Sequence, residues 1–206
     1  MSKKRGFFIV FEGPDRSGKT TQINLLFEFL KKKGFDVVLT REPGGTVVGE
    51  KIREIILDPL NVMSPLCELF LYEAARAEHV YQKINPSLGD GKIVLCDRFT
   101  IATEVYQGYG RGIDIGIIKT LNNIATSGIK PDLTICFKIK KDDYIKRKRE
   151  NSDRIEKEDT FIETIFNAYE MIYSNKDDIF IVDGSLDIYE IHEIIKKEVL
   201  KLIDVF

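Results

Sequence analysis

An eight-residue segment near the N-terminus has the spacing of a loop that binds phosphate: glycine, four variable residues, glycine, lysine and a hydroxyl residue. It follows the apolar run 7–11 and opens a helical pattern, and this context makes the spacing informative. Backbone N–H groups in such a turn, together with a helix N-terminus, attract phosphate oxygens. The residues predicted to bind a triphosphate are Gly13, Pro14, Asp15, Arg16, Ser17, Gly18, Lys19 and Thr20.

Three side chains suit the chemistry of phosphoryl transfer. Lys19 can reach the β and γ oxygens of a triphosphate, and the Thr20 hydroxyl can ligate Mg²⁺. Asp97 ends the apolar run 92–97, as in a Walker-B motif, and would lie beside the phosphate loop. We therefore expect Thr20 and Asp97 to hold Mg²⁺, directly or through water. The plainer alternative for Asp97 is a cap on the following helix.

Five short apolar segments supply the strands that must position these residues. Each is mostly apolar, as in strands buried on both faces, and helical patterns separate them. The strands are expected at 7–11, 36–40, 93–96, 133–137 and 179–182. The helices are expected at 19–33, 48–57, 64–86, 113–127, 141–150 and 160–174, with a last helix capped by Ser185. This alternation predicts an α/β fold with a five-stranded, mostly parallel sheet.

The chain length of 206 residues predicts one domain, 1–206. Only the segment 140–159 shifts in composition, being nearly all charged or polar. It is interpreted either as a solvated helix end or as a lid, over about 141–159, that brings charge to a substrate.

Composition and charge exclude several classes of protein. Lys and Arg number 31 against 33 Asp and Glu, a net charge of −2, which argues against a nucleic-acid partner. No run approaches the 18 or so apolar residues of a membrane span, and the apolar run after the basic N-terminus is too short for a signal sequence. Cys67, Cys96 and Cys136 lie in apolar runs and are predicted to be buried free thiols. We therefore expect a cytoplasmic protein.

One segment fits a guanine-binding pattern. Residues 175–178 read N-K-D-D, which matches N-K-x-D, but they follow a helix rather than a strand. Asp97 also does not begin a D-x-x-G segment. We interpret the match as chance, and a GTPase switch is a minor alternative.

Six further segments, together with the phosphate loop, resemble those of bacterial thymidylate kinases, in the family's order. They are T-R-E-P-G-G-T at 40–46, L-Y-E-A-A-R at 71–76, D-R-F at 97–99, Y-Q-G-Y-G-R-G at 106–112, P-D-L-T at 131–134 and D-R-I-E at 153–156. The resemblance spans about residues 6–185. It implies a P-loop NTPase-type three-layer sandwich with a short lid, and transfer of phosphate from ATP to dTMP with Mg²⁺.

The resemblance also assigns the pyrimidine side of the site. Tyr72 and Arg76 are four residues apart and share a helix face. The resemblance implies that Tyr72 stacks on thymine and that Arg76 bonds its O4. It further implies that Thr103 and Gln107 contact the base edge and that Tyr106 packs near the sugar 2′ position.

Charged residues are implied around the acceptor phosphate. Asp15 corresponds to the acid that bonds the 3′-OH of dTMP, and Arg53 and Arg98 correspond to arginines that hold its phosphate. Glu42, with Pro43 beside it, is expected to organise the substrate site through water or an arginine. The plainer interpretation of Glu42 is an acidic residue of a surface loop.

Arginines occur both in the phosphate loop and in the lid region, which mixes two patterns of the family. Arg16 is expected to contact the γ-phosphate. Arg147 is expected to stack on adenine, against a loop that contains Gly184. Arg149 and Arg154 fit solvated lid charges equally well. The residues expected to act in catalysis are Asp15, Arg16, Lys19, Asp97 and Arg98.

The acceptor phosphate is already anionic at neutral pH, so transfer needs positioning and charge neutralisation but no general base. The alternatives are a kinase for another nucleoside monophosphate and a non-catalytic nucleotide-binding regulatory protein. The helices around 48–57, 66–84 and 113–124 carry more apolar residues than one sheet face needs. Because the family forms homodimers through such helices, we expect a homodimer.

Overall fold

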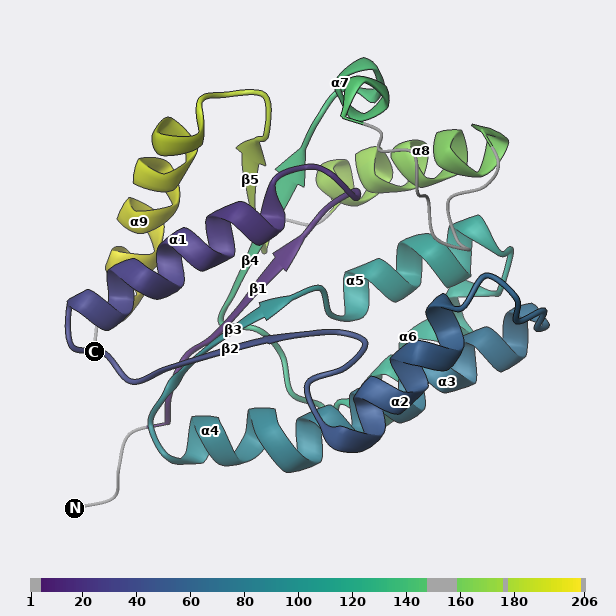
Figure 1. The fold of residues 1–206 in the computed structure, drawn as a ribbon, viewed down its shortest axis with the longest axis horizontal. Helices are drawn as coiled ribbons and strands as arrows, with labels where there is room; N and C mark the ends of the chain where they lie inside the picture. Colours follow the sequence, from purple (N-terminus) through teal and green to yellow (C-terminus); the bar gives the residue numbers. More distant parts are fainter. Residues whose placement is uncertain (1–4, 148–158, 176–177, 205–206) are drawn as a thin grey trace.

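A computed structural model describes residues 5–147, 159–175 and 178–204. Its centre is a five-stranded sheet in the order β2-β3-β1-β4-β5, with every pair of neighbours parallel (Figure 1). The strands are β1 (Phe8–Glu12), β2 (Val37–Arg41), β3 (Ile93–Asp97), β4 (Leu133–Lys138) and β5 (Ile179–Asp183). The predicted strands are thus confirmed to within one residue at each end, and so is the parallel sheet.

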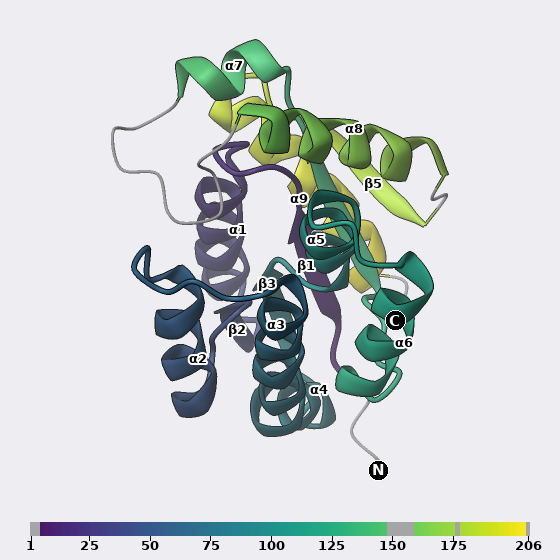
Figure 2. The same cartoon turned by 90° about the vertical axis from the view of Figure 1, so that its right-hand side faces the viewer.

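Helices cover both faces of the sheet and make three layers. Helices α1 (Lys19–Lys32) and α9 (Ile188–Asp204) pack together on one face (Figure 1). The other face is covered by η1 (Val80–Ile84), a π-helical turn, and by α4 (Asn85–Gly89), α5 (Thr100–Thr103), the π-helical η2 (Glu104–Gly110) and α8 (Asp159–Asn175). In Figure 2, α3 (Pro65–His79) lies between α2 (Val47–Leu57) and α6 (Ile115–Ala125). The short α7 (Lys141–Lys146) follows β4.

Strand β1 shows why the sheet needs both layers. Its side chains alternate, so that Ile9 and Phe11 join the cluster beneath α1 and α9, whereas Phe8 and Val10 join the cluster beneath η1 and α4. All four are essentially inaccessible to solvent. A strand buried on both faces carries apolar side chains on both, and this run of apolar residues identified it in the sequence.

Two helical regions differ from expectation. The helix predicted over 64–86 begins after Ser64, whose side chain accepts a hydrogen bond from the Cys67 N–H, and continues through η1 and α4 to Gly89. Residues 100–110, for which the sequence pattern gave no boundaries, form the continuous helix of α5 and η2. The helix expected over 141–150 ends at Lys146, and residues 148–158, which include most of the predicted lid, lie outside the described residues.

The prediction that all three cysteines are buried was wrong for one of them. Cys96 and Cys136 are buried in strands, but Cys67 is exposed in the first turn of α3. All three are free thiols. An apolar neighbourhood in sequence does not place a helix residue on the buried face, because only one stripe of an amphipathic helix faces the core. In the part of the chain that the structure describes, no helix is long and apolar enough to cross a membrane.

The predicted cap of the last helix was also wrong. Helix α9 begins at Ile188, and the Asp187 carboxylate accepts a hydrogen bond from the Tyr189 N–H at 2.8 Å. Ser185 instead donates its hydroxyl to Asp183 at 2.6 Å, within the turn after β5. Asp187 therefore occupies the capping position, two residues later than expected.

This correction predicts unequal effects of two substitutions. Asp187→Ala removes the acceptor of a helix N–H and should lower the free energy of unfolding by about 1 kcal/mol. Ser185→Ala removes only an exposed turn contact and should cost less than about 0.5 kcal/mol. Urea denaturation of the two variants and the wild type measures both values. A larger loss in Ser185→Ala would contradict the assignment.

Candidate active site

A cavity of about 870 Å³ lies beside the carboxyl ends of β1, β2 and β3. Its lining combines residues of the phosphate loop with residues from the loop after β2, from α2 and α3, and from the segment after β3. The predicted residues that line it are Asp15, Arg16, Gly18, Lys19, Thr20, Glu42, Pro43, Arg53, Tyr72, Arg76, Asp97, Arg98, Thr103, Tyr106, Gln107 and Arg147. The predicted residues outside its lining are Gly13, Pro14, Ser17 and Gly184.

The phosphate loop curls around the lysine side chain. Lys19 Nζ donates to the carbonyl oxygens of Gly13 at 2.9 Å and Pro14 at 2.6 Å. Gly13 has φ 137°, and a Cβ there would lie 2.7 Å from the Phe137 carbonyl oxygen, so the turn requires glycine. Burial, reinforced by the nearby Arg98 guanidinium, lowers the pKa of Lys19 to about 8. Lys19 is therefore fixed at the phosphate loop, and its ammonium group loses its proton more easily than that of an ordinary lysine.

Two oxygen-bearing side chains lie together, Thr20 at the start of α1 and Asp97 at the end of β3. The Thr20 hydroxyl donates to the Asp97 carboxylate at 2.9 Å. The strand pairing that aligns Phe11 with Asp97 brings them together. No group of three or more His, Cys, Asp or Glu side chains that could hold a metal ion occurs within residues 5–147, 159–175 and 178–204. A hydroxyl and a carboxylate fit Mg²⁺, which commonly takes one or two protein oxygens and fills its remaining positions with water and phosphate.

An ion pair joins the phosphate loop to the turn after β3. Arg98 Nη2 donates to one oxygen of Asp15 at 2.5 Å, and the Tyr106 hydroxyl donates to the other at 3.1 Å. The Arg98 guanidinium also lies 5.0 Å from the centre of the Tyr106 ring. Burial opposes the charge of Arg98, but the Asp15 carboxylate outweighs it, and the pKa of Arg98 lies well above its usual value. The cluster places a fixed positive charge on the cavity wall.

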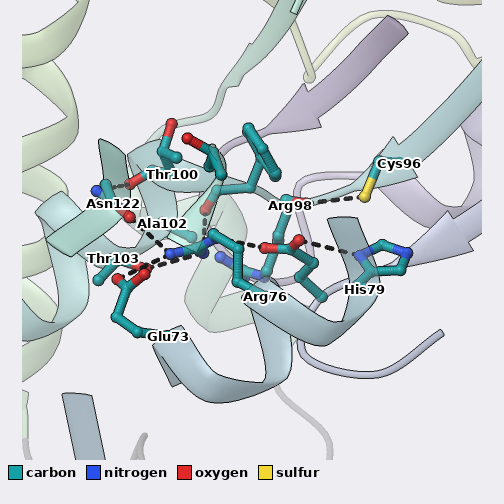
Figure 3. Close-up of polar contacts among 12 residues, drawn as sticks. Glu73, Arg76, His79, Cys96, Arg98, Thr100, Ala102, Thr103 and Asn122 are labelled. Atoms are coloured by element: carbon teal, nitrogen blue, oxygen red, sulfur yellow. Dashed lines mark hydrogen bonds and ion pairs between the residues drawn. The ribbon is translucent and has the colours of Figure 1, made fainter. Parts of the chain in front are cut away.

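Arg76 is the most completely bonded side chain of the site. An arginine has five N–H donors, and all five have protein acceptors here. Nε donates to Glu42 at 2.8 Å. Nη1 donates to Glu73 and Asn122 at 2.9 and 2.6 Å, and Nη2 to the Phe99 carbonyl and the Thr103 hydroxyl, both at 3.0 Å. Figure 3 shows Arg76 at the centre, between His79 on one side and Glu73, Thr103 and Asn122 on the other.

The charges around Arg76 explain its position. Its side chain is only 2% exposed, and a buried guanidinium is tolerated only when it is paired and fully hydrogen-bonded. Burial opposes ionisation of Glu42, but Arg76 and a hydrogen bond from His79 outweigh it, so the pKa of Glu42 is lowered. The expected hydrogen bond from Arg76 to a thymine carbonyl stays a prediction, and it requires one of these N–H groups to be shared with the substrate.

Other residues that the sequence predicts to contact dTMP also lie at the cavity. Gln107 Nε2 donates to the buried Glu68 at 2.9 Å, which fixes the amide beneath the cavity. Arg53 Nη1 donates to the Pro43 carbonyl oxygen at 2.9 Å. Tyr72 lines the same cavity one helical turn before Arg76. Their expected contacts with dTMP stay predictions.

The arginines near the phosphate loop contact protein groups. The Arg16 guanidinium lies 4.6 Å from the centre of the Tyr144 ring of α7. Arg147 donates to the carbonyl oxygens of Arg16 and Gly184, both at 3.1 Å, and so ties the end of α7 to the phosphate loop and the turn after β5. Arg149 and Arg154 lie outside the described residues.

Sequence reasoning missed a buried acid at the end of β1. Glu12 is fully buried, and its Oε1 accepts hydrogen bonds from the N–H groups of Phe99 at 2.8 Å and Ala102 at 3.3 Å. It therefore holds the turn that carries Arg98, whose φ of 72° is unusual for a residue with a side chain. Burial raises the pKa of Glu12. The sequence contained a signal for this role, because a glutamate at the end of an apolar strand, next to a phosphate loop, is a residue type that is seldom fully buried unless it is paired.

Comparison with known proteins agrees with this geometry. The family model described as thymidylate kinase matches residues 11–195. A thymidylate kinase of Sulfurihydrogenibium sp. strain YO3AOP1 is 49% identical over 193 residues, covering 92% of this chain and 95% of the relative. One from Caldanaerobacter subterraneus subsp. tengcongensis is 44% identical over 198 residues, covering 95% of each chain.

Solved structures lead to the same family. The crystal structure of thymidylate kinase from Ehrlichia chaffeensis superposes with a TM-score of 0.76 at 34% identity, covering 95% of this chain and 99% of that one. Because the family model spans residues 11–195 and curated relatives align over more than nine-tenths of the sequence, this chain belongs to the thymidylate kinase family.

Proposed function

We propose that this protein transfers the γ-phosphoryl group of ATP to the phosphate of dTMP, giving ADP and dTDP. The observation that carries the proposal is that one cavity joins the phosphate loop, with Lys19 and Thr20, to the aromatic and cationic side chains Tyr72 and Arg76. Such a cavity can hold a triphosphate and a pyrimidine nucleotide with their phosphates facing each other. The family membership supports this choice of nucleotides.

On the donor side, the loop N–H groups and Lys19 would hold the β and γ oxygens of ATP. Thr20 and Asp97 would hold Mg²⁺, which would supply positive charge to neutralise the phosphate oxygens. Arg16 would contact the γ-phosphate, and Arg147 would lie against adenine beside the turn that contains Gly184. Roles for Arg149 and Arg154 remain predictions from sequence.

On the acceptor side, Tyr72, Thr103 and Gln107 would contact thymine together with Arg76. Asp15 would accept a hydrogen bond from the sugar 3′-OH, and Arg53 and Arg98 would hold the phosphate. Tyr106, which already bonds Asp15, would pack near the 2′ position and disfavour ribonucleotides.

Transfer then depends on geometry and charge. The attacking oxygen belongs to a phosphate that is ionised at neutral pH, so no side chain has to remove a proton. Arg16, Arg98 and Lys19 would neutralise the charge that two facing polyanions bring together. Glu42 would act through Arg76, with which it forms a buried ion pair at 2.8 Å.

We also propose a cytoplasmic homodimer that needs no nucleic-acid or membrane partner. Apolar side chains are exposed along α2, α3 and α6, which lie side by side in Figure 2. Among them are Ile55 (47% exposed), Leu66 (50%), Phe70 (56%) and Ile124 (66%). Burial of these residues against a second copy would remove apolar surface from water. The free thiols support a reducing compartment.

An assay of ADP release tests the reaction. With ATP as donor, dTMP should be phosphorylated faster than dUMP, dGMP, CMP or AMP. Lys19→Ala should lower kcat about a hundredfold or more, because a fixed charge at the transferring phosphate is lost. Lys31→Ala, on the exposed surface of α1, is the matched control and should leave kcat unchanged. Turnover of AMP or CMP well above dTMP would contradict the proposal.

The pKa of Lys19 predicts a pH dependence of ATP binding. Bound phosphates favour the charged lysine, which is already protonated below its pKa of about 8. The affinity for ATP should therefore be constant just below pH 8. Above pH 8 it should decrease, approaching a tenfold decrease per pH unit, because ATP binding must then be accompanied by uptake of a proton. Calorimetry in buffers of different ionisation enthalpy measures affinity and proton uptake together. Lys19→Arg, which stays charged, should lose this dependence. A constant affinity for ATP up to about pH 9.5 in the wild type would contradict this prediction.

Light scattering tests the dimer. The wild type should have twice the chain mass of 23.6 kDa. Phe70→Glu places a charge within the exposed apolar surface and should give a monomer. Tyr189→Glu, 72% exposed on α9, is the matched control and should remain dimeric. A monomeric wild type would end this part of the proposal.

A further inference from the structure

A completely buried histidine joins three parts of the site without lining the cavity. His79 is the last residue of α3 and is 0% exposed. Its Nδ1 lies 3.0 Å from Glu42 Oε1, and its Nε2 lies 2.7 Å from Thr40 Oγ1. Figure 3 shows the ring on the opposite side of Arg76 from Glu73. The imidazole therefore connects the end of β2, the loop that follows it and the helix that carries Arg76.

Glu42 is held from two sides. One carboxylate oxygen accepts from Arg76 Nε at 2.8 Å, and the other faces His79 Nδ1. Glu42 is only 5% exposed, so water cannot readily replace a lost partner. Removing the histidine donor would leave a buried carboxylate oxygen unsatisfied, which is costly. The carboxylate would then turn, and Arg76 would lose the acceptor that fixes its Nε.

The ring nitrogens have separate tasks. When Nδ1–H donates to the Glu42 carboxylate, Nε2 of the neutral ring can accept from the Thr40 hydroxyl. One tautomer thus satisfies both neighbours. The hydroxyl orients the ring, and the ring orients the carboxylate, in the way that outer groups fix the ligands of a binding site.

The loop after Glu42 packs directly on this histidine. A Cβ at Gly45 would lie 2.6 Å from both His79 Nε2 and Thr40 Oγ1. Within the same loop, the Pro43 carbonyl accepts the hydrogen bond from Arg53. The position of the loop, and with it the position of Arg53, therefore depends on the plane of the imidazole ring.

We propose that His79 is a positioning residue for the acceptor nucleotide. By holding Glu42, it locks Arg76 for the base, and by supporting the loop from Glu42 to Gly45, it places Arg53 for the acceptor phosphate. This inference rests on the proposed phosphorylation of dTMP. Because no part of the ring lines the cavity, its effect on the substrate is transmitted through Glu42 and the loop.

Two amide substitutions separate the tasks of the ring nitrogens. His79→Asn places an amide N–H near the position of Nδ1 and keeps a donor for Glu42. His79→Gln places its amide near Nε2, keeps the contact with Thr40 and withdraws from Glu42. We expect His79→Gln to raise the KM for dTMP about tenfold or more, with the KM for ATP within about twofold of wild type. His79→Asn should recover most of the affinity for dTMP.

Three outcomes would overturn the proposal. The first is an unchanged KM for dTMP in His79→Gln. The second is that both amide variants show equal impairment of both KM values, of kcat and of Tm, which would indicate a purely structural histidine. If His79→Gln does not fold, Thr40→Val decides, since it releases the ring without changing the side chains of Glu42 and Arg76 themselves. Its KM for dTMP should rise at least twofold without a change for ATP, and no rise would overturn the proposal. Absence of dTMP turnover in the wild type would reject the proposed function itself, and this inference with it.

Discussion

Parallel pairing of β1, β2 and β3 is the constraint on which the site depends. The registers align both Phe11 and Arg41 with Asp97, so the phosphate loop, the Glu42 loop and the Arg98 turn leave the sheet at the same edge. Parallel strands require crossover helices, and these helices bury both faces of the sheet. The apolar composition of the strands therefore has two effects. It builds the core, and it fixes the edge of the sheet at which polar side chains meet.

Charged side chains at this edge are stabilised by ion pairs and hydrogen bonds within the protein rather than by exposure to water. Arg76 and Glu42 are both less than one-tenth exposed, and desolvating such charges is costly unless their donors and acceptors have partners. The five N–H groups of Arg76 meet this condition, and His79 supplies the remaining partner of Glu42. A side chain held in this way has little freedom left to lose when a ligand binds, which is the physical basis of preorganisation.

Backbone strain is concentrated at the same place. Arg16 and Arg98 both have positive φ, which residues with side chains adopt only when their surroundings compensate. For Arg98 the compensation comes from Glu12, whose carboxylate accepts the N–H groups that follow the turn, and from the Asp15 ion pair. For Arg16, contacts with Tyr144 and Arg147 join the loop to α7. These contacts connect the phosphate loop, Arg98 and the segment after β4.

Local periodicity and contiguous spacing were enough to predict the five strands, their parallel arrangement and the phosphate loop. The adjacency of Thr20 and Asp97 followed from the same reasoning about strand ends. Tertiary structure alone decided the partners of Arg76, since Glu42 and Asn122 lie 34 and 46 residues away in the chain. It also decided the burial of His79, the exposure of Cys67 and the choice of Asp187 over Ser185 as the cap. A local pattern records which residue types can pair or cap, but only packing between distant elements selects which of them do so.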